Sequence, residues 1–235
     1  LADSLVDGCL DIVSRQLSIP PVPSNGAGGG LAVIALGKLG GRELNYSSDI
    51  DLLFLAGSDA GTYHRLAERL IEALTRFTAE GFLYRVDLRL RPWGEVGPLV
   101  SSMEGYLAYL NEYARLWEKQ ALLKARPISG DMHVGEQLVR RVEPLLFSSA
   151  TQSIRSDVHA MKQRTEAHLR GQGRTWGEVK LGEGSIRDVE FVVQYLQLAH
   201  GAARPEVLGP NTPEALGRLR AAGLLSADDY RALAE

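Results

Sequence analysis

The sequence predicts an α+β fold in which a mixed sheet with flanking helices is followed by a bundle of helices. Two short apolar runs, 31–36 and 50–56, indicate buried strands, because they are rich in aliphatic residues and too short for helices. The segment 82–91 alternates polar and apolar residues, which is typical of a half-buried strand. Beyond residue 131 the apolar residues recur with the helical period, so we expect helices there.

The N-terminal elements follow from the same criteria. Residues 1–18 place apolar side chains on one stripe of an amphipathic helix, and the Pro- and Gly-rich residues 19–30 predict a connector. After the second strand we expect a helix that has Thr62 as its N-cap and ends at Gly81. Its buried side chains are predicted to be Leu66, Leu70, Ile71, Leu74 and Phe77.

The rest of the chain is predicted to be mainly helical. Helices and a final helical hairpin are expected over 101–123, 131–147, 151–172, 185–200 and 210–235. We therefore divide the chain into a first domain, 1–130, and a helical domain, 131–235. Because the chain starts at Leu1 without a methionine and ends at Glu235 within a helical pattern, we expect it to be part of a longer protein.

Composition and charge narrow the classes of function. A net charge of −3 and a pI near 6.0 give no overall basic field, so nucleic acid is not expected as a partner. No apolar run approaches the length of a membrane span, and no basic segment precedes an apolar one at the start, so neither a membrane helix nor a signal peptide is expected. The single cysteine, Cys9, forms no internal disulfide, which suits a cytoplasmic protein.

Two aspartates at the start of the second apolar run indicate a metal site. In an extended strand alternate side chains share a face, so Asp49 and Asp51 are predicted to point the same way. Two neighbouring carboxylates repel each other unless a cation or a proton lies between them. Mg²⁺ prefers a few carboxylates together with waters and phosphate oxygens. The spacing therefore predicts half of the ligand shell of a divalent cation.

A glycine-rich turn, residues 37–41, joins the two apolar runs and predicts a phosphate cradle. Glycine lets backbone N–H groups approach an anion closely, while lysine and serine side chains add a charge and donors. The expected phosphate-binding residues are Gly37, Lys38, Gly40, Gly41, Ser47 and Ser48. A Gly-x-x-Gly-Gly turn alone is usually only a turn, and an Asp-x-Asp pair is common on exposed strand edges. Their conjunction beside two buried strands is more specific.

The segment 82–91 adds a third carboxylate. Its polar face is predicted to carry Asp87 among Arg85, Arg89 and Arg91, a composition that suits a metal ligand beside a phosphate. The alternative is an arginine–aspartate ladder on a surface strand. Three aspartates on neighbouring strands can hold two metal ions about 3.5–4 Å apart. Lys124 and Arg126, which alternate before Pro127, are expected to extend the basic side of this site.

Three segments together resemble the glutamine synthetase adenylyltransferase family, of the polymerase-β-like nucleotidyltransferase superfamily. They are GKLGGRELN with SSDIDL (37–45 and 47–52), RVDLRLRP (85–92) and WEKQALLKAR (117–126). The resemblance extends over the whole chain and implies a nucleotidyltransferase core at 1–130. It also implies that Asp49, Asp51 and Asp87 hold Mg²⁺ or Mn²⁺.

Family members usually carry two such catalytic domains in one chain. One domain transfers AMP from ATP to a tyrosine of glutamine synthetase, and the other removes it with phosphate, releasing ADP. The resemblance therefore implies three partners: glutamine synthetase, a second nucleotidyltransferase domain in the rest of the chain, and nitrogen-signalling proteins of the PII type.

The segment 178–194, EVKLGEGSIRDVEFVVQ, is similar to a motif of the amino-terminal, deadenylylating half of these enzymes. Ser185 stands where the family has glycine, and with Asp188 it predicts an N-cap and a capping-box pair for the following helix. Arg187 and Glu190 share one stripe of that helix, which is most often simply a solvated face. Beside a cradle, Arg187 is suited to hold a phosphate and Glu190 to orient it.

We therefore predict adenylyl transfer on glutamine synthetase, in the direction of phosphorolytic removal of AMP from adenylyl-tyrosine. Lys38, Gly40 and Ser48 are expected to position phosphate, and Arg89 and Arg91 to stabilise developing charge. Three alternatives remain: ATP-dependent adenylylation of the same tyrosine, a nucleotidyltransferase of the same superfamily with another substrate, and a catalytically idle sensor domain that binds nucleotide and regulatory proteins.

Overall fold

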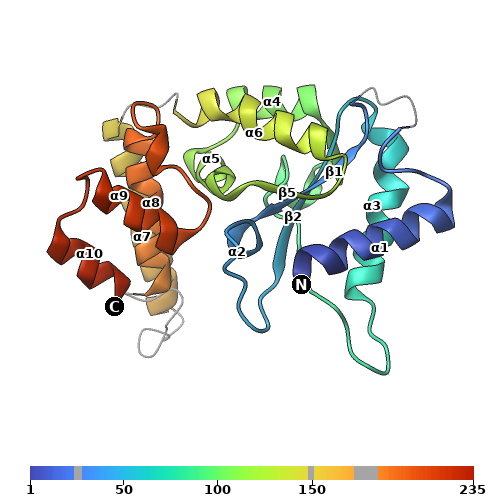
Figure 1. Cartoon of the computed structure of the whole chain (residues 1–235), viewed down its shortest axis with the longest axis horizontal. Coiled ribbons are helices and arrows are strands. Elements are labelled where there is room, and N and C mark those ends of the chain that lie inside the picture. The colour runs from blue at the N-terminus through green and yellow to red at the C-terminus, as the bar shows by residue number, and fades with distance from the viewer. Residues whose placement is uncertain (24–27, 148–150, 172–184) are drawn as a thin grey trace. The chain divides into compact units, whose positions relative to one another are not determined.

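The computed structural model describes residues 1–23, 28–147, 151–171 and 185–235 (Figure 1). The chain forms two compact units, Leu1–Leu145 and Leu146–Glu235. Helix α6, Met132–Leu146, therefore belongs almost entirely to the first unit, whereas the division of the sequence at residue 131 assigned it to the helical domain.

The first unit is built on a mixed five-stranded sheet, in agreement with the predicted fold class. Its strands are β1 (Leu31–Leu36), β2 (Ile50–Ala56), β3 (Val86–Asp87), β4 (Val100–Ser102) and β5 (Arg126–Gly130). The order is β3-β2-β1-β5, and β4 also pairs with β2. Strand β1 is antiparallel to β2 and β5, while β2 is parallel to β3 and β4. Strands β3 and β4 therefore share the edge of β2 that β1 leaves open.

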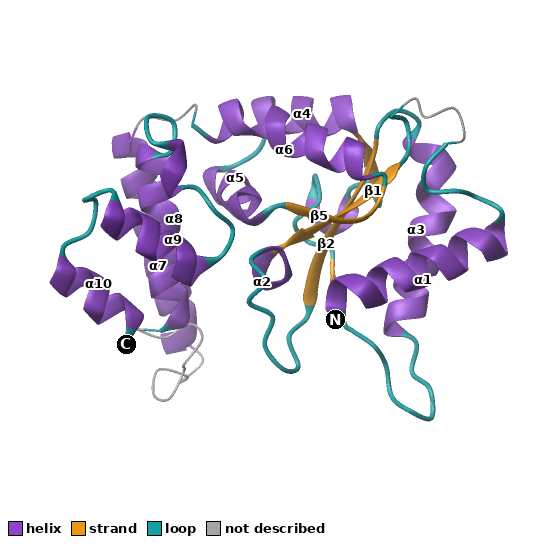
Figure 2. Cartoon of the chain, viewed as in Figure 1, coloured by secondary structure: helices purple, strands orange, loops and turns teal. Residues whose placement is uncertain are grey.

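Helices cover both faces of this sheet (Figure 2). Helices α1 (Ala2–Leu17) and α3 (Ala60–Thr75) pack on the face formed by alternate residues of β1 and β2, such as Val33 and Phe54. Helix α6 covers the other face, where a Cβ at Gly135 would lie 3.2 Å from Ile34 Cδ1. Because both faces are buried, β1 and β2 are apolar at nearly every position, as parallel or central strands require.

Helix α3 differs from its prediction at both ends. Its N-cap is Asp59, whose carboxylate accepts from Gly61 N at 3.0 Å and from Thr62 Oγ1 at 2.7 Å, so Thr62 lies inside the helix. The helix ends at Thr75, before the Thr78–Gly81 bridge turns the chain back. Phe77, expected to be buried, therefore lies beyond the helix and is exposed.

The ten-residue strand predicted over 82–91 is wrong, because only Val86 and Asp87 pair with β2. The Asp87 carboxylate accepts a hydrogen bond from the backbone N–H of Arg89 at 2.9 Å, and Arg91 N donates to Leu88 O at 3.2 Å. Such a local bond from an aspartate competes with the strand ladder and bends the chain. The sequence does alternate polar and apolar residues over 82–91, but the turn after Asp87 ends the strand there.

Several short elements surround the sheet. They are α2 (Gly37–Gly40), α4 (Met103–Glu112), α5 (Leu116–Ala121) and the 3₁₀ turns η1 (Gly94–Val96) and η2 (Leu122–Lys124). The sequence predicted a glycine-rich turn at 37–41, helices from residue 101 and no strand at 126–130, so α2, β4 and β5 were missed.

The second unit is helical, as predicted. It contains α7 (Thr151–Gly171), α8 (Ile186–His200), α9 (Thr212–Ala221), α10 (Ala227–Ala234) and the 3₁₀ turn η3 (Pro205–Val207). Its core includes Val193, Val207, Ala215, Leu216 and Leu219. None of the helices within the described ranges has the length and hydropathy that a membrane-spanning helix needs.

Helix α8 starts where the sequence predicted, but the capping box at its start is wrong. Ser185 occupies the N-cap position without a side-chain cap bond, and its buried hydroxyl has no hydrogen-bond partner among the described residues. Asp188 instead forms an ion pair with Lys162 at 2.9 Å. The part of the deadenylylation-like motif at 178–184, like residues 24–27 of the connector, lies outside the described residues.

Candidate active site

Asp51 and Asp87 lie directly beside each other on neighbouring strands. Asp51 is the second residue of β2 and pairs with Asp87 in the parallel register between β2 and β3. Residues in matching register of parallel strands project to the same face. Their neighbours Ile50 and Val86 pack into the core under α1 and α3, so the two carboxylates lie on the opposite face. The sheet thereby joins two acidic groups that are far apart in the sequence.

Gly37 makes room for the Asp51 carboxylate. It has a φ of +51°, and a Cβ at this position would lie 2.2 Å from Asp51 Oδ2. A side chain here would therefore both strain the backbone and displace the carboxylate. This glycine, at the junction of β1 and α2, lets an acidic group lie against the backbone at the start of α2.

Two arginines hold the other two aspartates. Arg85 Nε donates to Asp49 Oδ1 at 2.5 Å, and its Nη2 donates to the backbone oxygen of Ser47 at 2.5 Å. Arg89 donates to Asp87 Oδ2 from Nε at 2.9 Å and from Nη2 at 2.5 Å. The hydrogen bonds from Arg89 outweigh the effect of burial and lower the pKa of Asp87 below its ordinary value. Asp87 is therefore a stable anion at neutral pH.

These residues fit a divalent cation in part. Asp51 and Asp87 provide two adjacent hard oxygen ligands of the kind that Mg²⁺ and Mn²⁺ prefer. Asp49 lies before the first residue of β2 and is turned to Arg85. In this conformation no group of three or more His, Cys, Asp or Glu side chains within the described ranges is arranged to hold a metal ion. The side chains of Asp49 and Arg85 are 50% and 56% exposed. Breaking their ion pair, which would free Asp49 for a metal ion, would therefore expose both groups to water and not to the protein interior.

The residues predicted to bind phosphate differ in their surroundings. Lys38 lies in α2, and with the Asn45 amide oriented to face it, Asn45 Oδ1 accepts from Lys38 Nζ at 3.0 Å. Ser47 and Ser48 lie in the loop before β2; Ser47 is exposed and Ser48 half-buried.

The other two glycines of the predicted cradle are used by the fold. A Cβ at Gly40 would lie 2.0 Å from the backbone oxygen of Lys124, so this glycine allows η2 to approach. Gly41 is buried and its N–H donates to Gly37 O at 3.0 Å. Their role in holding phosphate stays a prediction.

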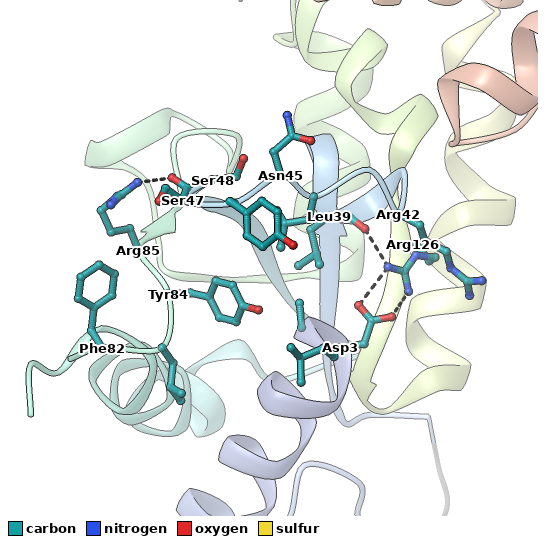
Figure 3. A pocket seen from close by; sticks show the side chains of 15 residues that line it. Asp3, Leu39, Arg42, Asn45, Ser47, Ser48, Phe82, Tyr84, Arg85 and Arg126 are labelled. Atoms are coloured by element: carbon teal, nitrogen blue, oxygen red, sulfur yellow. Dashed lines mark hydrogen bonds and ion pairs between the residues drawn. The ribbon is translucent and has the colours of Figure 1, made fainter. Parts of the chain in front are cut away.

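Three basic residues predicted for the site hold neighbouring segments together. Lys124 is buried and pairs with Glu43 at 3.0 Å. Arg126 donates to Asp3 on α1 and to Leu39 O at 2.8 Å (Figure 3). It also donates to Gly40 O at 3.1 Å. The Arg91 guanidinium donates to the backbone oxygens of Leu88, Glu95 and Gly97. The structure therefore brings these three cations into contacts that stabilise the loops around the site.

Arg187 and Glu190 lie on α8 in the second unit, and both are half-buried. Their role in phosphate binding stays a prediction. Sequence reasoning missed the acidic partners Asp3 and Glu43, because the segments that they join are distant in the sequence. It placed Arg85 on the polar face of a strand but did not identify it as the partner of Asp49.

Comparison with known proteins gives two family matches. A family model described as glutamate-ammonia ligase adenylyltransferase matches residues 1–141. A model described as GlnD PII-uridylyltransferase matches residues 152–235. The first match covers the sheet and all of the candidate metal ligands, and the second covers most of the second unit.

Curated relatives carry the name bifunctional glutamine synthetase adenylyltransferase/adenylyl-removing enzyme. The chain is 43% identical over 208 residues to the one from Streptomyces avermitilis, covering 85% of this chain and 21% of the relative. It is 37% identical over 245 residues to that from Hahella chejuensis, covering 96% and 25%. It is 35% identical over 254 residues to the relative from Mesorhizobium japonicum, and the match covers 100% of this chain and 26% of the relative. The chain thus spans about a fifth to a quarter of the length of these relatives. It belongs to the glutamate-ammonia ligase adenylyltransferase family.

Proposed function

We propose that the chain is a metal-dependent nucleotidyltransferase domain that removes AMP from an adenylylated tyrosine of glutamine synthetase. Phosphate is the acceptor and ADP the product. The observation that carries the proposal is the pairing of Asp51 with Asp87 against Gly37, in a chain of this family. The name of the relatives includes both adenylyl transfer and adenylyl removal.

The direction of transfer rests on the segment around Arg187. Its resemblance to the deadenylylating half favours removal of AMP. The same three aspartates serve ATP-dependent adenylylation equally well, so the forward reaction is the nearest alternative. An idle sensor domain is less favoured because Asp49, Asp51 and Asp87 are all present.

In the proposed reaction an oxygen of inorganic phosphate attacks the α-phosphorus of adenylyl-tyrosine. The bond between that phosphorus and the phenolic oxygen breaks, ADP forms, and the phenolate takes up a proton to restore tyrosine. Asp51 and Asp87, joined by Asp49, would hold Mg²⁺ or Mn²⁺, which when bound neutralises charge on the phosphoryl oxygens. Lys38 and Ser48 attract and orient the incoming phosphate. Arg89, whose side chain is 72% exposed, turns from Asp87 to the phosphoryl group.

The wider setting is also a proposal. We assign the second unit a role in contact with a PII-type signal protein, because it matches a family model whose description names PII. The chain covers about a quarter of its relatives, which supports a longer protein with a second nucleotidyltransferase domain. The proposed place of action is the cytoplasm.

The test is to incubate the chain with adenylylated glutamine synthetase, phosphate and Mg²⁺ or Mn²⁺, and to follow ADP. A parallel reaction contains ATP and unmodified synthetase, and pyrophosphate is followed. We expect ADP only when phosphate is present. Asp51→Asn should lower the rate by about 100-fold or more. Asp11→Asn, which changes an exposed aspartate on α1, is the matched control and should leave the rate unchanged.

Three other outcomes have distinct meanings. Pyrophosphate release with tyrosine labelling would make this the adenylylating domain. Silence in both reactions, with Mn²⁺ bound, would favour the sensor. Full activity of Asp51→Asn would refute the metal-dependent mechanism.

A further inference from the structure

A large pocket opens at the end of the sheet where β2 and β3 begin (Figure 3). Its volume is about 890 Å³. Three segments form most of its wall: the start of α1, the loop over 42–48 and the segment 82–85. Leu39 and Arg126 complete it. The volume is large enough for several side chains of a bound polypeptide.

This pocket adjoins the candidate metal site without containing it. Asp51, Asp87, Gly37 and Lys38 do not line it, whereas Ser48, which the proposed function assigns to the phosphate, lies in its wall. The pocket therefore borders the phosphate site and leaves the metal ligands outside. It is connected to the site through the loop before β2 and through Arg85, which lines the pocket and pairs with Asp49. A molecule in the pocket would therefore lie beside the reacting groups, where the tyrosine that carries AMP must approach.

The charges of the pocket favour an anionic occupant. Arg126 is compensated by Asp3, and Arg85 by Asp49. Arg42 is exposed and forms no ion pair with any residue in the described part of the chain. One guanidinium at the rim is therefore available for an anionic group such as a carboxylate, which arginine can bind through two hydrogen bonds.

The rim also carries exposed apolar and aromatic side chains. Tyr46 is fully exposed, and Phe82 and Leu83 are 43% and 44% exposed. Tyr84 lies inside the pocket and is half-buried. Tyrosine, phenylalanine and arginine are enriched in the cores of protein interfaces, where they act as anchors. A small ligand would not need aromatic residues that stand out from the rim.

We propose that this pocket is the docking site for the polypeptide segment that carries the modified tyrosine, and that a carboxylate of this segment pairs with Arg42. This inference rests on the proposed function, since it identifies how the protein substrate is held. Tyr46 packs on apolar side chains of the segment. Docking here places the tyrosine next to the loop that leads to Asp49 and Asp51.

The test separates docking from chemistry by using two substrates. Binding of the chain to immobilised adenylylated glutamine synthetase is measured for wild type, Arg42→Glu and Tyr46→Ala. Turnover of a minimal substrate, O-adenylyl-N-acetyltyrosinamide, is measured with phosphate and Mn²⁺. The control is Arg65→Glu, which reverses an exposed charge on α3 away from the pocket. Thermal unfolding verifies that the variants fold.

We expect Arg42→Glu and Tyr46→Ala each to raise the Kd for the synthetase by about tenfold, with Arg65→Glu unchanged. Turnover of the minimal substrate should be unchanged in all variants. Absence of binding by wild type, equal binding by all variants, or an equal loss in Arg65→Glu would overturn the docking site. Loss of minimal-substrate turnover in the pocket variants would also overturn it, because the pocket would then belong to the chemistry. If wild type binds as expected but turns over neither substrate, docking stands and the proposed function fails.

Discussion

Replacing Arg89 or Arg85 by glutamine is expected to raise the affinity of the chain for Mn²⁺. In the structure Arg89 forms an ion pair with the Asp87 carboxylate, and Arg85 forms one with the Asp49 carboxylate. A cation that binds these aspartates must first break both ion pairs, so the free energy of each pair is subtracted from that of metal binding. Removing an arginine removes this cost.

The two effects differ because the pairs differ in exposure. Arg85 and Asp49 are both about half exposed, and such a pair contributes about 0.2–1 kcal/mol, which corresponds to an affinity gain of about 1.4- to 5-fold. Asp87 is only 15% exposed and accepts hydrogen bonds from both Nε and Nη2 of Arg89. Because Arg89 is exposed and screened by solvent, we reduce the contribution of that pair to about 1–2 kcal/mol, which corresponds to a gain in Mn²⁺ affinity of about 5- to 30-fold.

Calorimetric titration with Mn²⁺, without nucleotide or phosphate, measures these affinities. The matched control is Arg91→Gln, which removes a nearby positive charge whose described partners are backbone oxygens. The expected order of gain is Arg89→Gln, then Arg85→Gln, then the control. An Arg89→Gln gain no larger than that of Arg91→Gln would refute competition between arginine and metal.

Two further predictions concern the fold around the site. Gly37→Ala should lose about 1–2 kcal/mol of unfolding free energy through its left-handed backbone and about tenfold or more in Mn²⁺ affinity by displacing Asp51, as measured by urea unfolding and calorimetry. Gly223→Ala has a similar φ of +72° with nothing within 4 Å, so it should show the strain without the loss of metal affinity. Because Arg89 lowers the pKa of Asp87, their pair stabilises the folded state above the ordinary pKa of 3.8 and loses this effect as the pH falls through the lower folded-state value. The difference in unfolding free energy between wild type and Arg89→Gln should therefore be constant well above the ordinary pKa of Asp87 and decrease as the pH falls below it. A difference that does not change with pH would contradict this.

The sequence predicted the two central strands, β1 and β2, well, because both are local apolar runs. It also predicted Asp51 and Asp87 on neighbouring strands. The sequence predicted the structure poorly where a contact with a distant residue, or a competing local hydrogen bond, determines the conformation. The guanidinium of Arg126 reaches α1 and α2, and Lys124 reaches Glu43, across distances in sequence that no local pattern reveals.

Two residues show what the sequence did not reveal. Asp87 binds the N–H of Arg89 and ends a strand whose pattern continues. At Gly40 the sequence indicated an anion cradle but not the close packing against η2, which also requires the lack of a side chain. In each case the residue type was informative and its partner was not visible in the sequence.

Strand β3 contains two residues, and this shortness has a kinetic consequence. Asp87 is held at the sheet edge by a short ladder that includes the bond from Ile50 N to Arg85 O at 2.9 Å. Short edge ladders open often, so their amides exchange hydrogen with solvent faster than those of central strands. A cation shared by Asp51 and Asp87 would tie this edge to the interior of the sheet. Amide hydrogen exchange in the segment of Asp87 should then slow when the cation binds, so this exchange rate would report whether the metal site is occupied.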